Sequence, residues 1–291
     1  MGIDACQLTS VVQLDHGCSA VLIHPRVLLY PAHCHGPFEH ARAGDVQLPI
    51  ERCQSYPDGT LFGSDLGFCV LREPAHDLAL IAPALGCEVD AVTPGAAAWL
   101  VGFGTGQKQI TQGTVERVDE EIAVAGAGFG ACTGDSGGPL LIEVDDGEQR
   151  ALRVAGILSA SSQAECGEST GYFTPLWPFL SWLETESGFD LSACGDPEGS
   201  WDPSPECLSY SRALLEPDSC DNAQTTFVSA ACGAAHSATE AAVQVHALDT
   251  SAGKQNAATC QNSFGRSHTS LSMLLGVVLL GLSRLLARVR R

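Results

Sequence analysis

Residues 131–140 run Ala131-Cys132-Thr133-Gly134-Asp135-Ser136-Gly137-Gly138-Pro139-Leu140 and decide between the folds open to this chain. The glycines around the serine let the backbone turn sharply and aim several N–H groups at one point. A serine hydroxyl becomes a nucleophile only when a neighbouring base takes its proton and donors await the developing oxyanion. An ordinary glycine-rich turn and a Gly-x-Ser-x-Gly elbow fit the same letters. A histidine and an aspartate in suitable contexts are needed to choose between these interpretations.

A histidine suited to be that base lies upstream, at His33. Two apolar runs, residues 20–23 and 27–30, are strand-like and are separated by a His-Pro turn. Cys18 and Cys34 bracket the two runs, so a disulfide between them would hold His33 at the end of a strand. The three histidines that follow the serine lie in a weakly patterned tail and are poor candidates: His236, His246 and His268.

These motifs resemble the chymotrypsin/trypsin family of serine proteases, whose signature is a cysteine, two strands and Ala-His-Cys. The order His, Asp, Ser along the chain also fits that family and excludes the Ser, Asp, His order of α/β-hydrolases. The resemblance covers residues 6–186. It implies an all-β fold of two packed six-stranded antiparallel β-barrels, with the site in the cleft between them. Residues 178–184 resemble the family's closing helix.

Two aspartates compete for the third position of this set. Asp77, in residues 76–81, is the more obvious match to the family's Asp-Ile-Ala-Leu pattern, and Asp65 begins another apolar run. We favour Asp65, because the turn, apolar stretch, Pro-Gly turn and strand that the family places next then all fit. Asp77 leaves only 24 residues before Gly102 and omits one element. Asp77 is then expected in a surface turn, and Asp45 in a solvated loop.

The resemblance implies a role for each residue. Ser136 would attack the scissile carbonyl, His33 would transfer the proton, and Asp65 would orient the imidazole. The N–H groups of Gly134 and Ser136 would form the oxyanion hole. Ser159 matches the family's serine beside the aspartate, on the strand that binds the substrate backbone. The alternative for Ser159 is an ordinary polar residue at a strand end.

The specificity pocket is expected from the same resemblance. Its floor lies six residues before the nucleophile in the family, which here is Gly130, followed by Ala131. Neither residue carries a carboxylate, so we expect no preference for lysine or arginine. Ser161 and Gly171 would line the walls and are small enough to admit an apolar or aromatic side chain.

The composition is typical of an exported protein. The 13 cysteines favour an oxidising compartment, whereas a net charge of −19 with two lysines argues against nucleic-acid binding. The cysteines and histidines lack zinc-site spacing, so we expect no metal and no other cofactor. Family resemblance implies the first two of the following disulfides, and elimination among the remaining cysteines adds the last two: Cys18–Cys34, Cys132–Cys166, Cys53–Cys69 and Cys6–Cys87.

The beginning of the chain departs from the family pattern. Mature family members begin Ile-Val-Gly-Gly, and the new amino group pairs with the aspartate before the nucleophile, which here is Asp135. Residues 1–6 show neither that motif nor a signal peptide. We expect either that the true start lies upstream, which we favour, or that Asp135 finds other partners.

The composition changes after the protease-like region, which we place at residues 1–190. Cysteines recur about every 13 residues in a Cys-rich extension, 191–232, and a flexible linker follows at 233–270. Residues 271–291 predict a hydrophobic helix followed by an arginine cluster. This end resembles bacterial C-terminal sorting tails, which implies a membrane segment and processing by a sorting protease. A buried amphipathic helix is the alternative.

The sequence therefore predicts a secreted or surface-anchored serine endopeptidase. It would hydrolyse protein or peptide substrates through an acyl-enzyme, with no nucleic acid as partner. The alternative is an inactive protease homologue that acts as a surface binding or adhesion protein. An intact set of His33, Asp65 and Ser136 argues against that alternative, because a binding protein has no need of all three.

Overall fold

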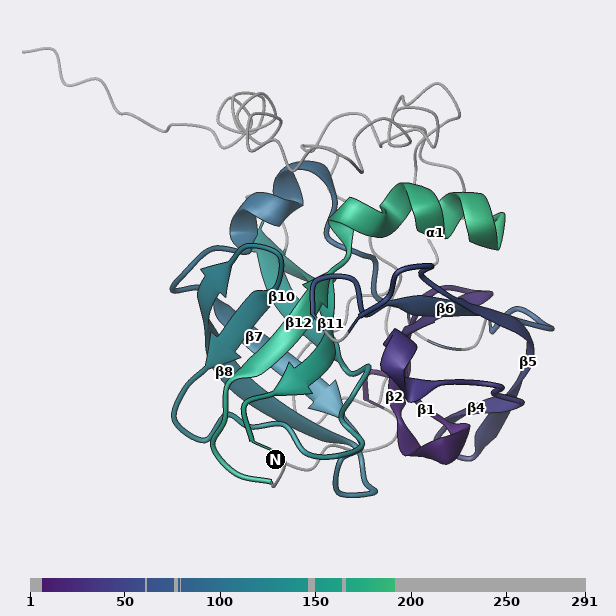
Figure 1. The fold of residues 1–291 in the computed structure, drawn as a ribbon, viewed down its shortest axis with the longest axis horizontal. Helices are drawn as coiled ribbons and strands as arrows, with labels where there is room; N and C mark the ends of the chain where they lie inside the picture. Colours follow the sequence, from purple (N-terminus) through teal and green to yellow (C-terminus); the bar gives the residue numbers. More distant parts are fainter. Residues whose placement is uncertain are drawn as a thin grey trace, which may run out of the picture.

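Two closed six-stranded antiparallel barrels make up most of the chain that the structure describes (Figure 1). The structure, a computed structural model, describes residues 7–60, 62–75, 78, 80–145, 150–163 and 166–191. The barrels are followed by a short helix, α1 (Leu180–Ser187). The predicted fold class is confirmed, including the closing helix, which begins two residues later than the sequence pattern indicated.

The first barrel has the strand order β1-β2-β3-β6-β5-β4 and closes through the pairing of β1 with β4. The runs that we expected to be strands form β2 and β3, and both are buried over nearly their whole length. Their two faces pack into different cores: Leu22 and Leu28 face one cluster, and Val21 and Leu29 face another. This double burial explains why the sequence there is continuously apolar and not alternating. The strands are β1 (Val11–Leu14), β2 (Ser19–His24), β3 (Val27–Tyr30), β4 (His40–Ala43), β5 (Val46–Ser55) and β6 (Gly67–Leu71).

The second barrel has the strand order β10-β11-β12-β9-β8-β7, with β10 paired to β7. Its own core contains Phe129, Leu140 and Phe173. The strands are β7 (Ala97–Gly102), β8 (Gln109–Val118), β9 (Ile122–Ala125), β10 (Pro139–Asp145), β11 (Arg150–Ser161) and β12 (Gly171–Pro175). Short 3-10 turns are η1 (Asp15–Gly17), η2 (Ala32–Cys34), η3 (Gly86–Ala91) and η4 (Trp177–Phe179).

An apolar cluster joins the two barrels. Val21 and Leu29 of the first barrel pack in it with Leu141 and Ile157 of the second. Helix α1 completes the cluster and lies near β6, where the Trp182 ring is 5.4 Å from that of Phe68 (Figure 1). Because this shared core fixes one barrel against the other, loops from both barrels can be held together at one site.

Three disulfides are formed in the described chain: Cys18–Cys34, Cys53–Cys69 and Cys132–Cys166. The Cys6–Cys87 prediction involves a residue outside the described ranges, as do the Cys-rich extension, the linker and the hydrophobic helix predicted at 271–291. No helix among the described residues is long and apolar enough to cross a membrane.

A buried lysine ties the segment before β1 to the second barrel. Lys108 is 5% exposed, and its Nζ donates to the carbonyl oxygens of Gln7 (3.1 Å) and Leu8 (3.0 Å). Burial lowers the pKa of the Lys108 ammonium to about 8. A buried cation whose pKa is lowered weakens the fold at neutral pH and ceases to do so once it loses its proton.

We therefore expect the stability of the protein to respond to Lys108 in the alkaline range. Above pH 8 the folded protein has lost a proton that the unfolded lysine keeps to about pH 10.4, so unfolding becomes harder as pH rises. Urea unfolding at several pH values between 7 and 10.5 should show the wild type gaining about 3 kcal/mol relative to Lys108→Met. A difference that stays constant with pH would contradict a lowered pKa.

Candidate active site

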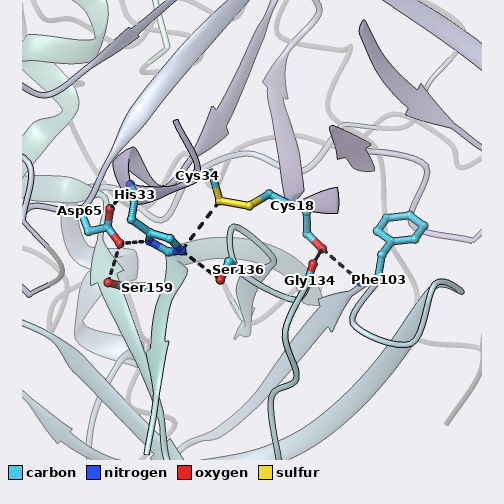
Figure 2. Close-up of a disulfide and its surroundings, with 9 residues drawn as sticks. Cys18, His33, Cys34, Asp65, Phe103, Gly134, Ser136 and Ser159 are labelled. Carbon is cyan, nitrogen blue, oxygen red and sulfur yellow. Dashed lines mark hydrogen bonds and ion pairs between the residues drawn. A yellow bond between two sulfur atoms is a disulfide. The ribbon is translucent and has the colours of Figure 1, made fainter. Parts of the chain in front are cut away.

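Three side chains predicted from separate motifs lie in one chain of hydrogen bonds (Figure 2). His33 sits on η2 of the first barrel, Asp65 just before β6, and Ser136 in the loop that leads to β10. The Nδ1 atom of His33 lies 2.6 Å from Oδ2 of Asp65, and its Nε2 atom lies 3.1 Å from Oγ of Ser136. This is the geometry in which an imidazole can take a proton from a hydroxyl.

The Asp65 carboxylate is completely buried and held on both oxygens. Its Oδ1 accepts the backbone N–H of His33 (2.9 Å), and its Oδ2 accepts the hydroxyl of Ser159 (2.7 Å) as well as facing Nδ1. The hydroxyl of Thr174 donates to the Asp65 backbone carbonyl (3.3 Å). Ser159 thus lies where the sequence analysis expected it, beside the aspartate. The competing candidate, Asp77, lies outside the described residues.

Local structure places His33 at the edge of the first barrel. Strand β3 ends at Tyr30, and extended Pro31 leads directly into η2. The 3-10 turn ends at His35, which has a φ of +45° and stops the turn from continuing. The Cys18–Cys34 disulfide fastens the residue after His33 to the start of β2 (Figure 2).

The nucleophile loop has the sharp turn that its glycines allow. Gly134 has a φ of +101°, and Gly137 has a φ of +87° with no room for a side chain, because a Cβ there would lie 2.0 Å from the Ser19 carbonyl oxygen. Neighbouring N–H groups donate hydrogen bonds within the fold. The N–H of Asp135 donates to the Cys132 carbonyl oxygen, and the N–H of Gly138 donates to the Asp135 carbonyl oxygen. Within the described chain, the N–H groups of Gly134 and Ser136 donate to no protein acceptor.

The carboxylate of Asp135 holds this loop through hydrogen bonds to two backbone N–H groups. Its Oδ1 accepts the N–H of Gly104 (2.7 Å), and its Oδ2 accepts the N–H of Cys132 (2.8 Å). The pKa of this carboxyl is raised above its ordinary value by burial, although the two backbone hydrogen bonds lower it in part. A Cβ at Gly102 or Gly104 would lie 2.3 or 2.5 Å from the carboxylate oxygens, which explains the two glycines. Both oxygens of Asp135 therefore have partners in the described chain.

A family model described as Trypsin matches residues 4–183, which is more than half of the chain. The chain belongs to the trypsin family. It is similar to the suppressor of tumorigenicity 14 protein homolog of Bos taurus, with 24% identity over 219 residues that cover 60% of this chain and 25% of that protein. It is similar also to a tryptase of Mus musculus, with 23% identity over 215 residues that cover 58% of this chain and 77% of the tryptase.

A shorter and more similar match is clotting factor C of Tachypleus tridentatus, with 42% identity over 57 residues. That match covers 19% of this chain and 6% of the clotting factor. The chain thus spans only a small part of the clotting factor and a quarter of the suppressor of tumorigenicity 14 protein homolog.

The residues expected at the pocket of this trypsin-family domain gather around a serine that the sequence analysis missed. Ser169 Oγ accepts the Ala131 N–H (3.3 Å) and the Ser161 hydroxyl (2.9 Å). A Cβ on Gly130 would lie 1.7 Å from the carbonyl oxygen of Gly167, so this position admits no side chain. The Cys132–Cys166 disulfide links the two segments.

Gly171 begins β12 and pairs with Ser161 of β11, and a Cβ on Gly171 would face the core. A Cβ there would lie 3.0 to 3.3 Å from the side chains of Phe173, Phe129 and Leu158. The glycine therefore leaves room for tight packing around Phe129, the residue that directly precedes Gly130.

Another buried carboxyl, that of Glu121, lies close enough to Asp65 to be affected by its charge. The pKa of Glu121 is raised above its ordinary value, mainly by burial. The charge of Asp65 raises it further, whereas the Gly63 N–H and Arg117 lower it in part. Its Oε1 has no hydrogen-bond partner among the described residues. The sequence offers no signal for this residue, because Glu121 sits in an acidic turn that is typical of a solvated surface.

Proposed function

We propose that this protein is a serine endopeptidase that hydrolyses peptide bonds through an acyl-enzyme. The observation that carries the proposal is the line of contacts from Asp65 through His33 to Ser136, with 2.6 Å and 3.1 Å between the paired atoms. Each contact joins residues from different loops, and the carboxylate is buried. A fold alone does not imply an activity, so the proposal rests on these side chains.

The reaction uses the imidazole of His33 in both directions. Ser136 Oγ attacks the scissile carbonyl carbon while Nε2 of His33 takes the hydroxyl proton. The imidazolium then gives that proton to the leaving amine as the C–N bond breaks, which leaves the acyl group on Oγ. Water attacks the ester in the second half, its proton goes to Nε2, and the acid is released as Ser136 regains a proton.

Asp65 selects the useful tautomer of His33. Because Oδ2 of Asp65 accepts a hydrogen bond from Nδ1–H, the proton stays on Nδ1 and Nε2 carries a lone pair toward Ser136. Two further donors, the His33 N–H and the Ser159 hydroxyl, leave the carboxylate a single orientation. The same carboxylate stabilises the positive charge that the imidazole acquires in the transition state.

The oxyanion would be stabilised by the N–H groups of Gly134 and Ser136. Support comes from their lack of protein acceptors within the described chain and from the rigid hydrogen bonding of the residues between and beside them. Preorganised donors of this kind contribute about 3 kcal/mol each to transition-state stabilisation.

For the substrate, we propose peptides with an apolar or aromatic residue before the scissile bond. Gly130 has no side chain, and the Gly167 carbonyl oxygen lies where a carboxylate-bearing side chain would begin. A lysine or arginine side chain would have to be buried there without a carboxylate from position 130 or 131, which is unfavourable. The neighbouring hydroxyls of Ser161 and Ser169 satisfy each other and Ala131.

We also propose that the protein is exported. Three disulfides in the described residues fit an oxidising compartment. Anchoring by the segment 271–291, and its processing by a sorting protease, remain predictions from sequence.

Covalent labelling tests the proposed activity. The full chain, produced under oxidising conditions, is treated with a fluorophosphonate probe, and the labelled residue is located by mass spectrometry. We expect stoichiometric labelling of Ser136 and hydrolysis of peptide substrates. A folded protein that resists labelling and cleaves no peptide would contradict the proposal and favour a binding role.

A peptide library varied at the residue before the scissile bond tests the substrate class. We expect kcat/KM for phenylalanine or leucine to exceed that for lysine or arginine by about 100-fold or more, because positions 130 and 131 offer no carboxylate to the cation. Equal or greater activity on lysine would show that a charged partner comes from elsewhere in the chain.

A further inference from the structure

We propose that Ser19 is a positioning residue that holds the oxyanion-binding loop in its active shape. The inference rests on the proposed peptidase function, and it assigns a role to a residue for which the sequence analysis found none. Ser19 opens β2 in the first barrel and is completely buried, whereas its partners belong to the second barrel.

Three hydrogen bonds join Ser19 to the site. Its hydroxyl donates to the carbonyl oxygen of Gly134 (2.8 Å) and accepts the N–H of Phe103 (3.0 Å). Its own backbone N–H donates to the carbonyl oxygen of Ser136 (2.8 Å). Figure 2 shows Cys18, Gly134 and Phe103 on the side of Ser136 that faces away from Asp65.

These bonds fix two peptide planes of the nucleophile loop. The plane after Gly134 is held at its oxygen by Ser19 and at its N–H by the Cys132 carbonyl. The plane after Ser136 is held at its oxygen by Ser19 and at its N–H by the Leu158 carbonyl. The N–H of Ser136 belongs to the plane between these two, so its direction follows from theirs.

Gly134 needs such a constraint because it is a glycine. Its φ of +101° suits glycine, but glycine also rotates more freely than other residues. Without the Ser19 hydroxyl, the peptide after Gly134 would lose one of the two bonds that hold it. The N–H of Gly134, which the proposed mechanism aims at the oxyanion, lies in the preceding peptide. That peptide is joined to the released one through the two freely rotating bonds of Gly134, so the direction of its N–H would become less defined as well.

Ser19 also links this loop to its second support. Phe103, whose N–H binds the Ser19 hydroxyl, precedes Gly104, whose N–H binds the Asp135 carboxylate (2.7 Å). On the other side, Ser19 follows Cys18, which is joined by a disulfide to Cys34 beside His33. One buried residue thus connects the segment that carries the base with the loop that carries the nucleophile.

Ser19→Ala in the full chain tests the proposal, with Ser10→Ala as the matched control. Ser10 is also completely buried in the first barrel, but its hydroxyl has no hydrogen-bond partner among the described residues. We expect Ser19→Ala to lower kcat by about 10- to 100-fold with KM changed less than about two-fold, because buried acceptor and donor groups are left unpaired next to the oxyanion donors. Ser10→Ala should leave kcat within about two-fold.

Inhibitor binding separates positioning from general destabilisation. A peptidyl trifluoromethyl ketone forms a tetrahedral adduct with an oxyanion, so its affinity should fall by the same factor as kcat/KM. The affinity of a product peptide should stay within about two-fold. Equal losses for both ligands, or an unchanged kcat in folded Ser19→Ala, would overturn the proposal.

Hydrogen exchange gives a readout that does not depend on activity. In Ser19→Ala, peptides covering residues 131–140 should exchange about tenfold faster than in the wild type, whereas Ser10→Ala should leave them unchanged. Wild-type protein that fails to react with fluorophosphonate would refute the peptidase function alone. Unchanged exchange in Ser19→Ala would refute the positioning role alone.

Discussion

Replacing Ser136 by alanine is expected to abolish peptide hydrolysis, with kcat lowered by about 10⁶-fold. The reason is that Ser136 Oγ lies 3.1 Å from Nε2 of His33. In the described site it is the only nucleophilic atom at that nitrogen that can form an acyl intermediate. What remains in the variant is substrate binding and stabilisation by the loop N–H groups, which supply a small residual rate. Initial rates on a fluorogenic peptide and labelling by fluorophosphonate measure the loss.

The fold should tolerate this substitution. Ser136 is only half-buried, and its backbone bond to Ser19 is retained in alanine. The matched control is Thr133→Ala, which removes an exposed hydroxyl from the same loop and should leave the rate unchanged. Labelling that survives in Ser136→Ala would mean that another residue reacts with the probe and would remove Ser136 as the nucleophile.

Continuous motifs made the fold and the central residues predictable from sequence. His33 and Ser136 each have sequence neighbours that indicate a particular local structure. A cysteine that can form a disulfide follows the histidine, and glycines that allow a sharp turn surround the serine. Asp65 required more, because a closer local match existed at Asp77. The number of elements that must fit between the aspartate and Gly102 favoured Asp65. The structure places Oδ2 of that residue 2.6 Å from Nδ1 of His33.

The supporting residues could not be predicted, because their purpose depends on distant partners. The Ser19 hydroxyl contacts Gly134, 115 residues away, and Thr174 contacts Asp65, 109 residues away. A serine after a cysteine or a threonine in a strand carries no local mark of such a contact. Ser169 is similar, since an acceptor for Ala131 and Ser161 is recognisable only after the chain has folded.

The difference between these two groups has a physical origin. A side chain that takes part in chemistry needs a particular backbone conformation around it, such as a sharp turn or the end of a strand. That conformation restricts which residues can flank the side chain, so it is recognisable in consecutive residues. A side chain that orients another needs only a hydroxyl of the right size at the right place. Ser19 satisfies that need at the start of β2, a strand whose position is fixed by the apolar cluster between the barrels.

Asparagine at position 65 would reverse the tautomer of His33. The two carboxylate oxygens accept three donors: the His33 N–H, its Nδ1–H and the Ser159 hydroxyl. If the asparagine oxygen takes the place of Oδ1, its NH₂ group faces Nδ1 and donates to it. The imidazole proton then moves to Nε2, which faces Ser136 and can no longer accept from it. If the amide flips, its NH₂ group meets the His33 N–H, and two donors face each other in a buried site.

We therefore expect Asp65→Asn to lower kcat by about 10⁴-fold while the protein stays folded, because shape and volume are preserved. Rates of peptide hydrolysis and of fluorophosphonate labelling should fall together, since both need a proton acceptor at Nε2. Asp45→Asn, in an exposed turn, is the matched control, and Asp77→Asn tests the competing assignment. Both should retain activity within about two-fold. A large loss in Asp77→Asn combined with an active Asp65→Asn would show that the wrong aspartate has been assigned to His33.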